Sequence, residues 1–287
     1  MIRYPITLAE LEALVDAASP GWRAKAATRT AGFSAAGRYE EASSIWSQVK
    51  SAFMKLQHNK CAYCERALAA IDHGGSIEHD LEHFRPKSSV VIWPGGNEFA
   101  FPTGAASSAG YFWLAYHLQN YAASCKKCNS PLKDNYFPVP GARGGAAGDP
   151  PALNSADKQF LLHPIGDIDD DPQAVIAFLG INAIPAKKTG PRRRRGDVTI
   201  AFFELNDREE LWRERAALLD SLGHHLETIN DPAEVDSRKV KRTVERMLRP
   251  QAQHSSCVKS MVDLYMADTE QARQLIVAAR EFCDSLV

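Results

Sequence analysis

The chain has 287 residues, of which 45% are apolar and 24% charged, and its formal net charge is −1. These values are ordinary for a soluble globular protein, and they exclude a chain that binds nucleic acid through an overall basic surplus. The longest apolar runs, 174–180 and 198–203, are too short to cross a bilayer, and the N-terminal MIRYP lacks the start of a secretory signal. We therefore expect a cytoplasmic protein without a membrane partner.

The N-terminal segment is predicted to be helical. Residues 7–18 carry apolar side chains at helical spacing behind Thr7, a suitable N-cap, with Glu10 three positions later. Residues 39–58 repeat apolar side chains at a similar spacing and predict a longer helix. Both patterns are interpreted as core packing.

The middle of the chain mixes short predicted strands with loops and helices. Strand-like character marks 77–84 and 90–93, and the Gly-, Ser- and Ala-rich stretch 94–110 indicates a loop. The aromatic stretch 111–118 is predicted to be a core helix, and another helix is expected over 125–132.

The last part of the chain follows a second stretch rich in Gly and Pro, 138–151, which predicts a boundary or a flexible crossing. Two strands are expected at 174–179 and 198–205, with the four arginines 192–195 in the loop between them. The chain from 207 onward is predicted to be helical, with breaks near 231–232 and 249–250.

Four cysteines form two pairs with two intervening residues each: Cys61, Cys64, Cys125 and Cys128. This is the spacing of metal-binding knuckles, and four thiolates close a tetrahedral zinc site that has no position open for chemistry. A reducing compartment argues against disulfides. We expect a structural Zn²⁺, with Cys257 and Cys283 as buried small apolar side chains.

The segment between the cysteine pairs and the residues around the second pair carry side chains suited to phosphodiester hydrolysis. Such a reaction needs a base that takes a proton from water near neutral pH, and His83 fits this role. Glu82 and Asn129 offer oxygen ligands for a hard cation such as Mg²⁺ or Mn²⁺. Asn120 is suited to pinning the loop.

The order of these residues resembles that of the HNH endonucleases, which have a ββα-metal fold. The resemblance rests on Cys61-x-x-Cys64, Glu82-His83, Asn120, Cys125-x-x-Cys128-Asn129 and Lys133. It implies that His83 is the general base and that Glu82 and Asn129 hold the catalytic metal. It also implies that Asn120 braces the loop. The acidic position is usually Asp in that family, and a second acidic–His pair, Glu78-His79, precedes the preferred one.

A narrower resemblance points to the PtuB branch of these nucleases, which serves the Septu anti-phage system alone or attached to a retron. It rests on Cys61-x-Tyr63-Cys64-Glu65, Glu82-His83-Phe84-Arg85-Pro86-Lys87, Tyr111-x-Trp113-Leu114-Ala115-Tyr116 and Phe137-Pro138. Weaker matches are Leu162-His163-Pro164 and the segment from Thr199-Ile200 to Leu205-Asn206. The match covers roughly residues 55 to 215 and implies a PtuA-like ABC ATPase as partner, with a retron reverse transcriptase in some systems. The chain itself shows no P-loop.

Nucleic-acid contacts are expected from basic residues around the motif. They are Arg85, Lys87, Lys126, Lys127 and Lys133. Lys126 and Lys127 are favoured because they lie inside the second knuckle, whereas Arg85 and Lys87 equally fit a role in solvating the loop. The arginines 192–195 are interpreted as a solvated loop, with phosphate binding as the alternative.

The predicted fold class is α+β and predominantly helical, with a zinc-clamped ββα-metal core and helical extensions. The expected domains are an N-terminal helical segment (1–58), an HNH core (59–140) and a C-terminal assembly region (152–287). The predicted function is metal-dependent hydrolysis of nucleic acid, with DNA as the expected substrate and RNA as the alternative, in anti-phage defence. A zinc-stabilised adaptor without catalysis and a general restriction or recombination HNH nuclease remain as alternatives.

Overall fold

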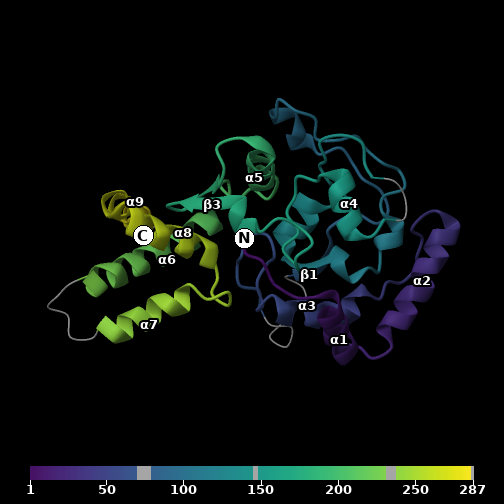
Figure 1. The fold of residues 1–287 in the computed structure, drawn as a ribbon, viewed down its shortest axis with the longest axis horizontal. Helices are drawn as coiled ribbons and strands as arrows, with labels where there is room; N and C mark the ends of the chain where they lie inside the picture. The colour runs from purple at the N-terminus through teal and green to yellow at the C-terminus, as the bar shows by residue number, and fades with distance from the viewer. Residues whose placement is uncertain (70–78, 145–147, 231–236, 286–287) are drawn as a thin grey trace. The chain divides into compact units, whose positions relative to one another are not determined.

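The computed structural model describes residues 1–69, 79–144, 148–230 and 237–285. The chain forms two compact units (Figure 1). The larger unit comprises Arg3–Tyr63 and Ala67–Pro172, and the smaller unit comprises Gln173–Val287 together with Met1–Ile2 and Cys64–Arg66. The domain limits expected from the sequence stay predictions.

The larger unit combines short helices with one two-stranded sheet. Its α-helices are α1 (Leu8–Ala18), α2 (Trp22–Ala36), α3 (Lys50–Leu56) and α4 (Pro150–Asp157). Its strands are β1 (His79–His83) and β2 (Tyr121–Cys125). Its short 3₁₀ helices are η1 (Trp46–Val49), η3 (Pro94–Glu98), η4 (Phe112–Leu114) and η5 (Leu118–Asn120), and η6 (Cys128–Lys133) is a π-helix. Helices α1 and α3 lie side by side near β1 (Figure 1).

The first helix begins where the sequence predicts it. The Thr7 hydroxyl accepts the amide of Glu10, and the Glu10 carboxylate accepts the amide of Thr7, so the capping box is complete. The helix buries Leu11 and Val15 on one face. Helix α2 was not predicted, because its many Ala and Thr residues give little apolar periodicity.

Strands β1 and β2 form an antiparallel pair that η6 follows in the chain. Their register places His79 opposite Cys125 and His83 opposite Tyr121. The predicted strand 77–84 therefore exists over 79–83, and residues 77–78 lie outside the described part of the chain. This order of two strands and a helix brings the acidic–His pair and the second cysteine pair together.

Several predicted elements of the larger unit are wrong. The helix expected over 39–58 begins only at Trp46, because the preceding residues are engaged in tertiary contacts, such as the Ile45 amide on the Tyr116 hydroxyl. Residues 111–118 form short turns instead of one helix. Residues 90–93 make only isolated bridges, from Val90 to Ser107 and from Val91 to Tyr136.

The smaller unit contains a second two-stranded sheet and five helices among its described residues. These are β3 (Ile176–Leu179), β4 (Asn182–Pro185), α5 (Gly190–Phe202), α6 (Glu209–Asn230), α7 (Ser237–Met247), α8 (Ser255–Ala267) and α9 (Thr269–Asp284). Strand β3 confirms the predicted strand 174–179 in shortened form. The C-terminal helices and the break near 249–250 are also confirmed, whereas the break expected at 231–232 lies outside the described residues.

The strand predicted at 198–205 is wrong, and so is the arginine-rich loop before it. Residues 190–202 form α5, so the four arginines stand on a helix whose second residue is Pro191. The run from Val198 to Ile200 has strong strand propensity, but all three residues are buried on the helix. Tertiary packing overrides the local preference here.

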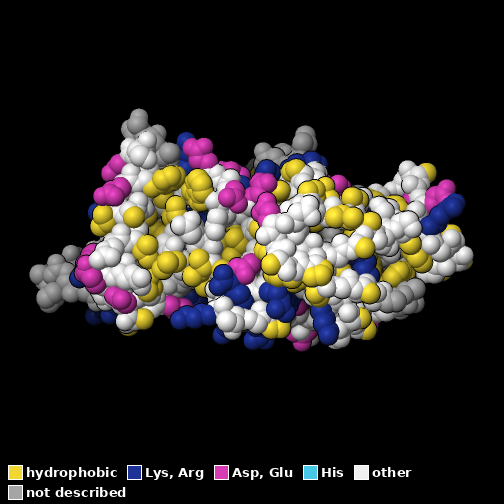
Figure 2. Space-filling view, turned by 90° about the horizontal axis from the view of Figure 1, so that it is seen from above, with side chains coloured by type: hydrophobic (Ala, Val, Ile, Leu, Met, Phe, Trp, Pro, Cys, Tyr) yellow, Lys and Arg dark blue, Asp and Glu magenta, His cyan; other side chains and the backbone are white. Residues whose placement is uncertain are grey.

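The surface shows no single sign of charge. Side chains of Lys and Arg and side chains of Asp and Glu both appear on the face in Figure 2. No described helix is both long enough and apolar enough to span a bilayer.

Candidate active site and cysteine cluster

The four paired cysteines come together in the fold. Their Sγ atoms all lie within 4.8 Å of one another, and all four residues are buried and free of disulfides. In a tetrahedral zinc site with Zn–S bonds near 2.3 Å, neighbouring sulfurs are about 3.8 Å apart. The cluster fits this geometry after small adjustments, and its donors can hold a zinc ion.

The first knuckle is attached to the edge of β2. The Ala62 amide donates to the Ala123 carbonyl at 3.0 Å. The buried Gln57 side chain accepts the Ala123 amide at 2.7 Å and donates to the Ala123 carbonyl at 2.8 Å and the Lys60 carbonyl at 3.0 Å. This Gln57 clamp fixes the chain just before Cys61. The clamp could not be predicted from the sequence, because a single glutamine carries no periodic signal.

The second knuckle is set by secondary structure. Cys125 ends β2, and Cys128 begins η6, so strand and helix deliver the two thiols. Asn129 follows in η6, and its position is therefore tied to that of Cys128. A metal in the cluster would hold β2 and η6 together at this point.

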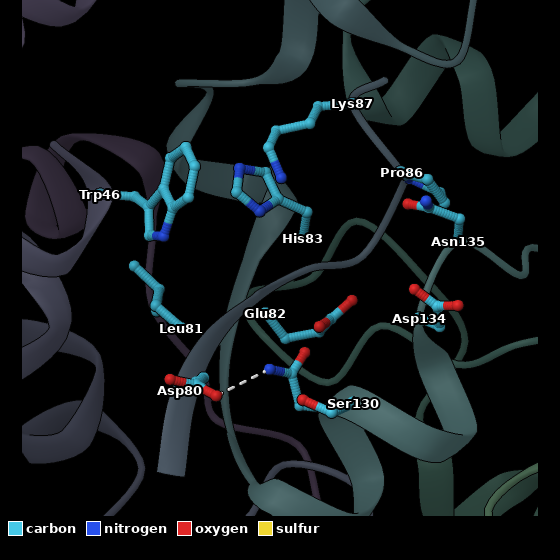
Figure 3. A pocket seen from close by; sticks show the side chains of 11 residues that line it. Trp46, Asp80, Leu81, Glu82, His83, Pro86, Lys87, Ser130, Asp134 and Asn135 are labelled. Atoms are coloured by element: carbon cyan, nitrogen blue, oxygen red, sulfur yellow. Dashed lines mark hydrogen bonds between the residues drawn. The ribbon is translucent and has the colours of Figure 1, made fainter. Parts of the chain in front are cut away.

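A pocket of about 270 Å³ lies between β1 and η6 in the larger unit. It is lined by Trp46, Asp80, Leu81, Glu82, His83, Pro86, Lys87, Asn129, Ser130, Asp134 and Asn135 (Figure 3). His83 lies between Trp46 and Lys87 in this view, and Glu82 comes from the same strand. The pocket therefore collects an imidazole, three carboxylates, two amides and an ammonium group.

The His83 ring is held in one orientation. Its Nε2 lies 3.0 Å from the Ala115 carbonyl, which can only accept, so Nε2 carries the hydrogen and Nδ1 is the basic atom of the neutral ring. Trp46 and Tyr121 pack edge-on against it, with ring centroids 4.9 and 5.0 Å away. Burial lowers the pKa of His83 well below its usual value, and Lys87 adds to the effect. The ring is therefore neutral near pH 7.

Glu82 is a buried carboxylate between two cations. Its Oε1 lies 3.5 Å from the Nζ of Lys133, which is fully buried. Burial raises the pKa of Glu82 to about 7, against the opposing attraction of Lys133 and Lys87. Burial also lowers the pKa of both lysines. A buried carboxylate of this kind gains from a nearby divalent cation, which would favour its charged form.

Asp80 orients the amide of Asn129. The Nδ2 of Asn129 donates to Asp80 Oδ2 at 3.0 Å, which leaves its Oδ1 as the atom available to a cation. Lys126 pairs with the same oxygen at 2.8 Å. Burial alone would raise the pKa of Asp80, but the hydrogen bonds from Lys126 and Asn129 outweigh it, and the pKa is lowered.

Asn120 lies behind the pocket and braces the chain after β1. Its Oδ1 accepts the Arg85 amide at 2.8 Å, and its Nδ2 donates to the carbonyls of Arg85 at 3.0 Å and Leu114 at 3.2 Å. Its side chain is fully buried. Asn120 thus fixes the backbone beside His83 and does not line the pocket.

The expected basic contacts separate into two groups. Lys87 lines the pocket and stacks on Trp46, with Nζ 4.6 Å from the ring centroid, and Lys126 and Lys127 are exposed. Arg85 is 1% exposed and pairs with Asp157 at 3.1 Å, so it has a structural role instead of the expected phosphate contact. Lys133 is likewise buried, beside Glu82.

Three pocket residues were not predicted from the sequence: Asp80, Asp134 and Trp46. Asp80 and Glu82 alternate along β1, and this i, i+2 spacing was the signal that could have found Asp80. Asp134 ends η6 with a φ of 35°, which local sequence does not reveal. Of the alternative pair, Glu78 lies outside the described residues, and His79 directs Nε2 to the Ala69 carbonyl and does not line the pocket.

Fold and site together define a helix-rich α+β protein with a cluster of four cysteines whose thiols can hold a metal ion, and a polar pocket on one strand and one helix. The chain is similar to the Septu protein PtuB of Bacillus mycoides (strain KBAB4), with 32% identity over 168 residues. This confirms the predicted resemblance to PtuB. The match covers 58% of this chain and only half the length of that relative. No protein-family model matches the chain, and no solved structure matches it significantly.

Proposed function

We propose that the protein is a metal-dependent endonuclease that hydrolyses nucleic-acid phosphodiester bonds, with DNA as the expected substrate. The observation that carries the proposal is the pocket itself. A neutral imidazole with one available basic nitrogen shares it with the oxygen donors Glu82 and Asn129. The HNH resemblance of the same residues supports this assignment.

In the proposed reaction, His83 Nδ1 accepts a proton from water as the water attacks phosphorus. The hydrogen bond from Nε2 to the Ala115 carbonyl keeps the ring in the correct tautomer. Lys87 lies beside His83 and is placed to attract the phosphate oxygens. Asn120 holds the backbone that follows His83, so the base keeps its place during turnover.

Glu82 and Asn129 would hold Mg²⁺ or Mn²⁺, and Asp80 orients the Asn129 amide for that purpose. When bound, the cation supplies positive charge that stabilises the oxygen leaving phosphorus. The donor set of carboxylate and amide oxygens suits a hard cation of this kind. Zinc in the cysteine cluster would have a structural role.

The biological setting follows from the similarity to PtuB of the Septu system. We propose a role in anti-phage defence, together with a PtuA-like ABC ATPase and, in some systems, a retron reverse transcriptase. The near-neutral charge of the chain supports an assembly in which a partner helps to bind the nucleic-acid substrate. We place this function in the cytoplasm.

The test compares plasmid cleavage by the native chain and His83→Ala, each with its ATPase partner, with and without Mg²⁺. We expect the substitution to reduce cleavage by at least about 10²–10⁴-fold, because it removes the base. Zinc content should stay the same, since His83 does not contact the cysteines. The matched control is His224→Ala, whose side chain is 67% exposed on α6.

Unchanged cleavage by His83→Ala would contradict the mechanism. Cleavage that needs zinc but no added Mg²⁺ or Mn²⁺ would also contradict it. A complete absence of cleavage in the native assembly, with the partner still bound, would favour the zinc-stabilised adaptor. Cleavage without any ATPase partner would favour a general restriction or recombination nuclease.

A further inference from the structure

Helix α7 and the turn after it carry a concentration of positive charge that the whole chain does not show. Residues 237–249 contain six cations and one acid: Arg238, Lys239, Lys241, Arg242, Arg246 and Arg249, with Glu245. All six cations are exposed, although the net charge of the chain is only −1. One short element therefore presents a strongly positive surface.

Three of these arginines form a ridge along one face of the helix. Arg238, Arg242 and Arg246 recur every fourth residue, so successive guanidinium groups start about 6 Å apart along the axis. The apolar side of the helix is opposite, where Val244 is buried and α7 packs against α6. The arginine ridge consequently faces solvent.

Within the described part of the chain, the α7 cations form no ion pair. Arg242 donates to the Arg238 carbonyl, and Arg246 donates to the Thr243 hydroxyl, so neither contact neutralises charge. Three other arginines of the same unit, with side chains 43%, 54% and 49% exposed, are paired: Arg193 with Asp197, Arg213 with Glu209 and Arg273 with Glu227. The ridge therefore differs from these three arginines.

Helix stability does not explain the pattern. Like charges four residues apart destabilise a helix, and the ridge contains two such pairs. Arg238 and Lys239 also stand in the first turn, where positive charge opposes the helix dipole. Only Arg246, in the last turn, favours the helix dipole. The two like-charge pairs and the cations of the first turn therefore need another explanation, and an anionic ligand outside the chain supplies it.

We infer that the exposed face of α7 binds the phosphate backbone of nucleic acid. Guanidinium groups bind phosphate oxygens in a bidentate manner, and a row of them follows a polyanion without reading its sequence. Arginine is preferred over lysine on the ridge, which agrees with this use. The inference does not depend on the cleavage chemistry, because it concerns binding alone.

The experiment measures binding of a fluorescent DNA duplex of random sequence over a salt series from about 50 to 200 mM. The protein carries His83→Ala, so that the DNA stays intact, and is compared with the same protein carrying R238Q, R242Q and R246Q. We expect weaker binding and a salt slope (log K against log salt) that is smaller by about 2 to 3, since three phosphate contacts are lost. Lysine at the three positions should restore most of the slope.

The matched control removes the same amount of charge from paired arginines, with R193Q, R213Q and R273Q. It should leave the slope nearly unchanged, and circular dichroism checks that both variants keep their helices. An unchanged slope in the α7 variant, an equal loss in the control, or no binding by the parent protein at low salt would each overturn the inference. If the α7 variant no longer bound an ATPase partner but bound DNA as before, the inference would also be overturned, and the face would be assigned to protein binding.

The test of α7 and the test of the proposed nuclease activity can fail independently. If His83→Ala cleaves normally but the α7 variant binds poorly, the catalytic proposal fails and the α7 inference stands. If α7 has no effect while His83→Ala is inactive, the reverse holds. Single-stranded DNA and RNA probes of the same length then show which nucleic acid the face prefers.

Discussion

Asp80 accepts two hydrogen bonds, and they differ in their importance. The ion pair with Lys126 is partly exposed, with the lysine side chain 59% accessible, and such pairs contribute little. The bond from Asn129 is internal to the pocket and selects which amide atom remains available. Asp80 is therefore a positioning residue in the proposed site.

We predict that Asp80→Ala weakens Mn²⁺ binding by about 10–100-fold, because loss of an outer partner lets the Asn129 amide rotate. Isothermal titration calorimetry on the zinc-loaded protein measures the affinity. The control is Asp263→Ala, which removes an exposed carboxylate paired with Lys259 on α8. Equal affinities in Asp80→Ala and the native protein would show that Asn129 needs no such support.

His163 gives a prediction for pH. It is 2% exposed and packs on Phe84 at 4.8 Å, and burial lowers its pKa from 6.5 to about 4. As pH falls, His163 becomes protonated in the unfolded chain before it does in the folded protein. Burial of the neutral ring therefore contributes its full share of the free energy of unfolding above about pH 6.5, and this contribution is lost toward pH 4. We expect His163→Phe to lose about 3 kcal/mol less stability than the native protein over this window.

Urea unfolding at several pH values measures this difference. Metal release at low pH affects both proteins alike and cancels in the comparison. Parallel stability curves for the two proteins would mean that His163 does not titrate differently in the folded and unfolded states.

Individual site residues were predictable where a short motif joins chemistry to spacing. The cysteine pairs could be grouped from sequence alone, and so could the pair Glu82-His83. The exposure of individual side chains could not be predicted, because Arg85 and Lys133 look like solvent-facing cations in the sequence and are buried in the fold. Their partners, Asp157 and Glu82, lie far along the chain.

At the level of elements, the Gln57 clamp ties α3 to β2. One side chain satisfies both backbone groups of Ala123 and the carbonyl before Cys61. We predict that Gln57→Ala lowers the free energy of unfolding by about 1–3 kcal/mol, because buried backbone groups lose their partners. It should also speed zinc loss to a chelator.

Chemical denaturation and a colorimetric zinc assay test the clamp. Gln48→Ala is the control, since Gln48 is exposed on η1 of the same unit. Identical zinc-release rates for Gln57→Ala and the native protein would contradict a role for the clamp in the knuckle.

Elements were predicted best where one local signal dominates. The capping box predicts α1, and long amphipathic patterns predict the C-terminal helices. Helix α5 was misread because its β-branched run has strand propensity, while its burial comes from packing that the sequence does not show. The short turns of 111–120 carry the same aromatic residues as a core helix would.

At the scale of the whole molecule, the smaller unit is not one continuous stretch of chain. It includes Cys64–Arg66, and the Glu65 carboxylate accepts the Ser255 hydroxyl at 3.2 Å and the Ser256 amide at 3.3 Å at the start of α8. Glu65 has a φ of 62° and is 1% exposed. Glu65, which directly follows the last cysteine of the first knuckle, therefore supports a helix nearly two hundred positions later.

We predict that Glu65→Ala destabilises the smaller unit by about 1–3 kcal/mol, because it leaves buried donors of α8 unsatisfied. Hydrogen exchange of the α8 amides should speed up more than that of β1. Glu209→Ala, which removes an exposed carboxylate of α6, is the control. Unchanged exchange in α8 would show that the Glu65 segment is dispensable.

This division of the chain could not be read from composition. The stretch rich in Gly and Pro at 138–151 suggested a boundary, whereas the compact units separate near Pro172, and the short segments Met1–Ile2 and Cys64–Arg66 belong to the smaller unit. Such assignments depend on contacts between distant residues, which the local pattern of glycine and proline does not encode.

The bond between His83 Nε2 and the Ala115 carbonyl also limits how the imidazole can be regenerated. A histidine with two accessible nitrogens can accept a proton on one nitrogen and release one from the other. In His83 only Nδ1 is available for both steps, because Nε2 is bonded to the Ala115 carbonyl. In the proposed reaction the proton taken from water would have to leave by the same side on which it arrived. Recovery of the base between turnovers would then compete with departure of the cut strand, and buffer catalysis of the steady-state rate would reveal it.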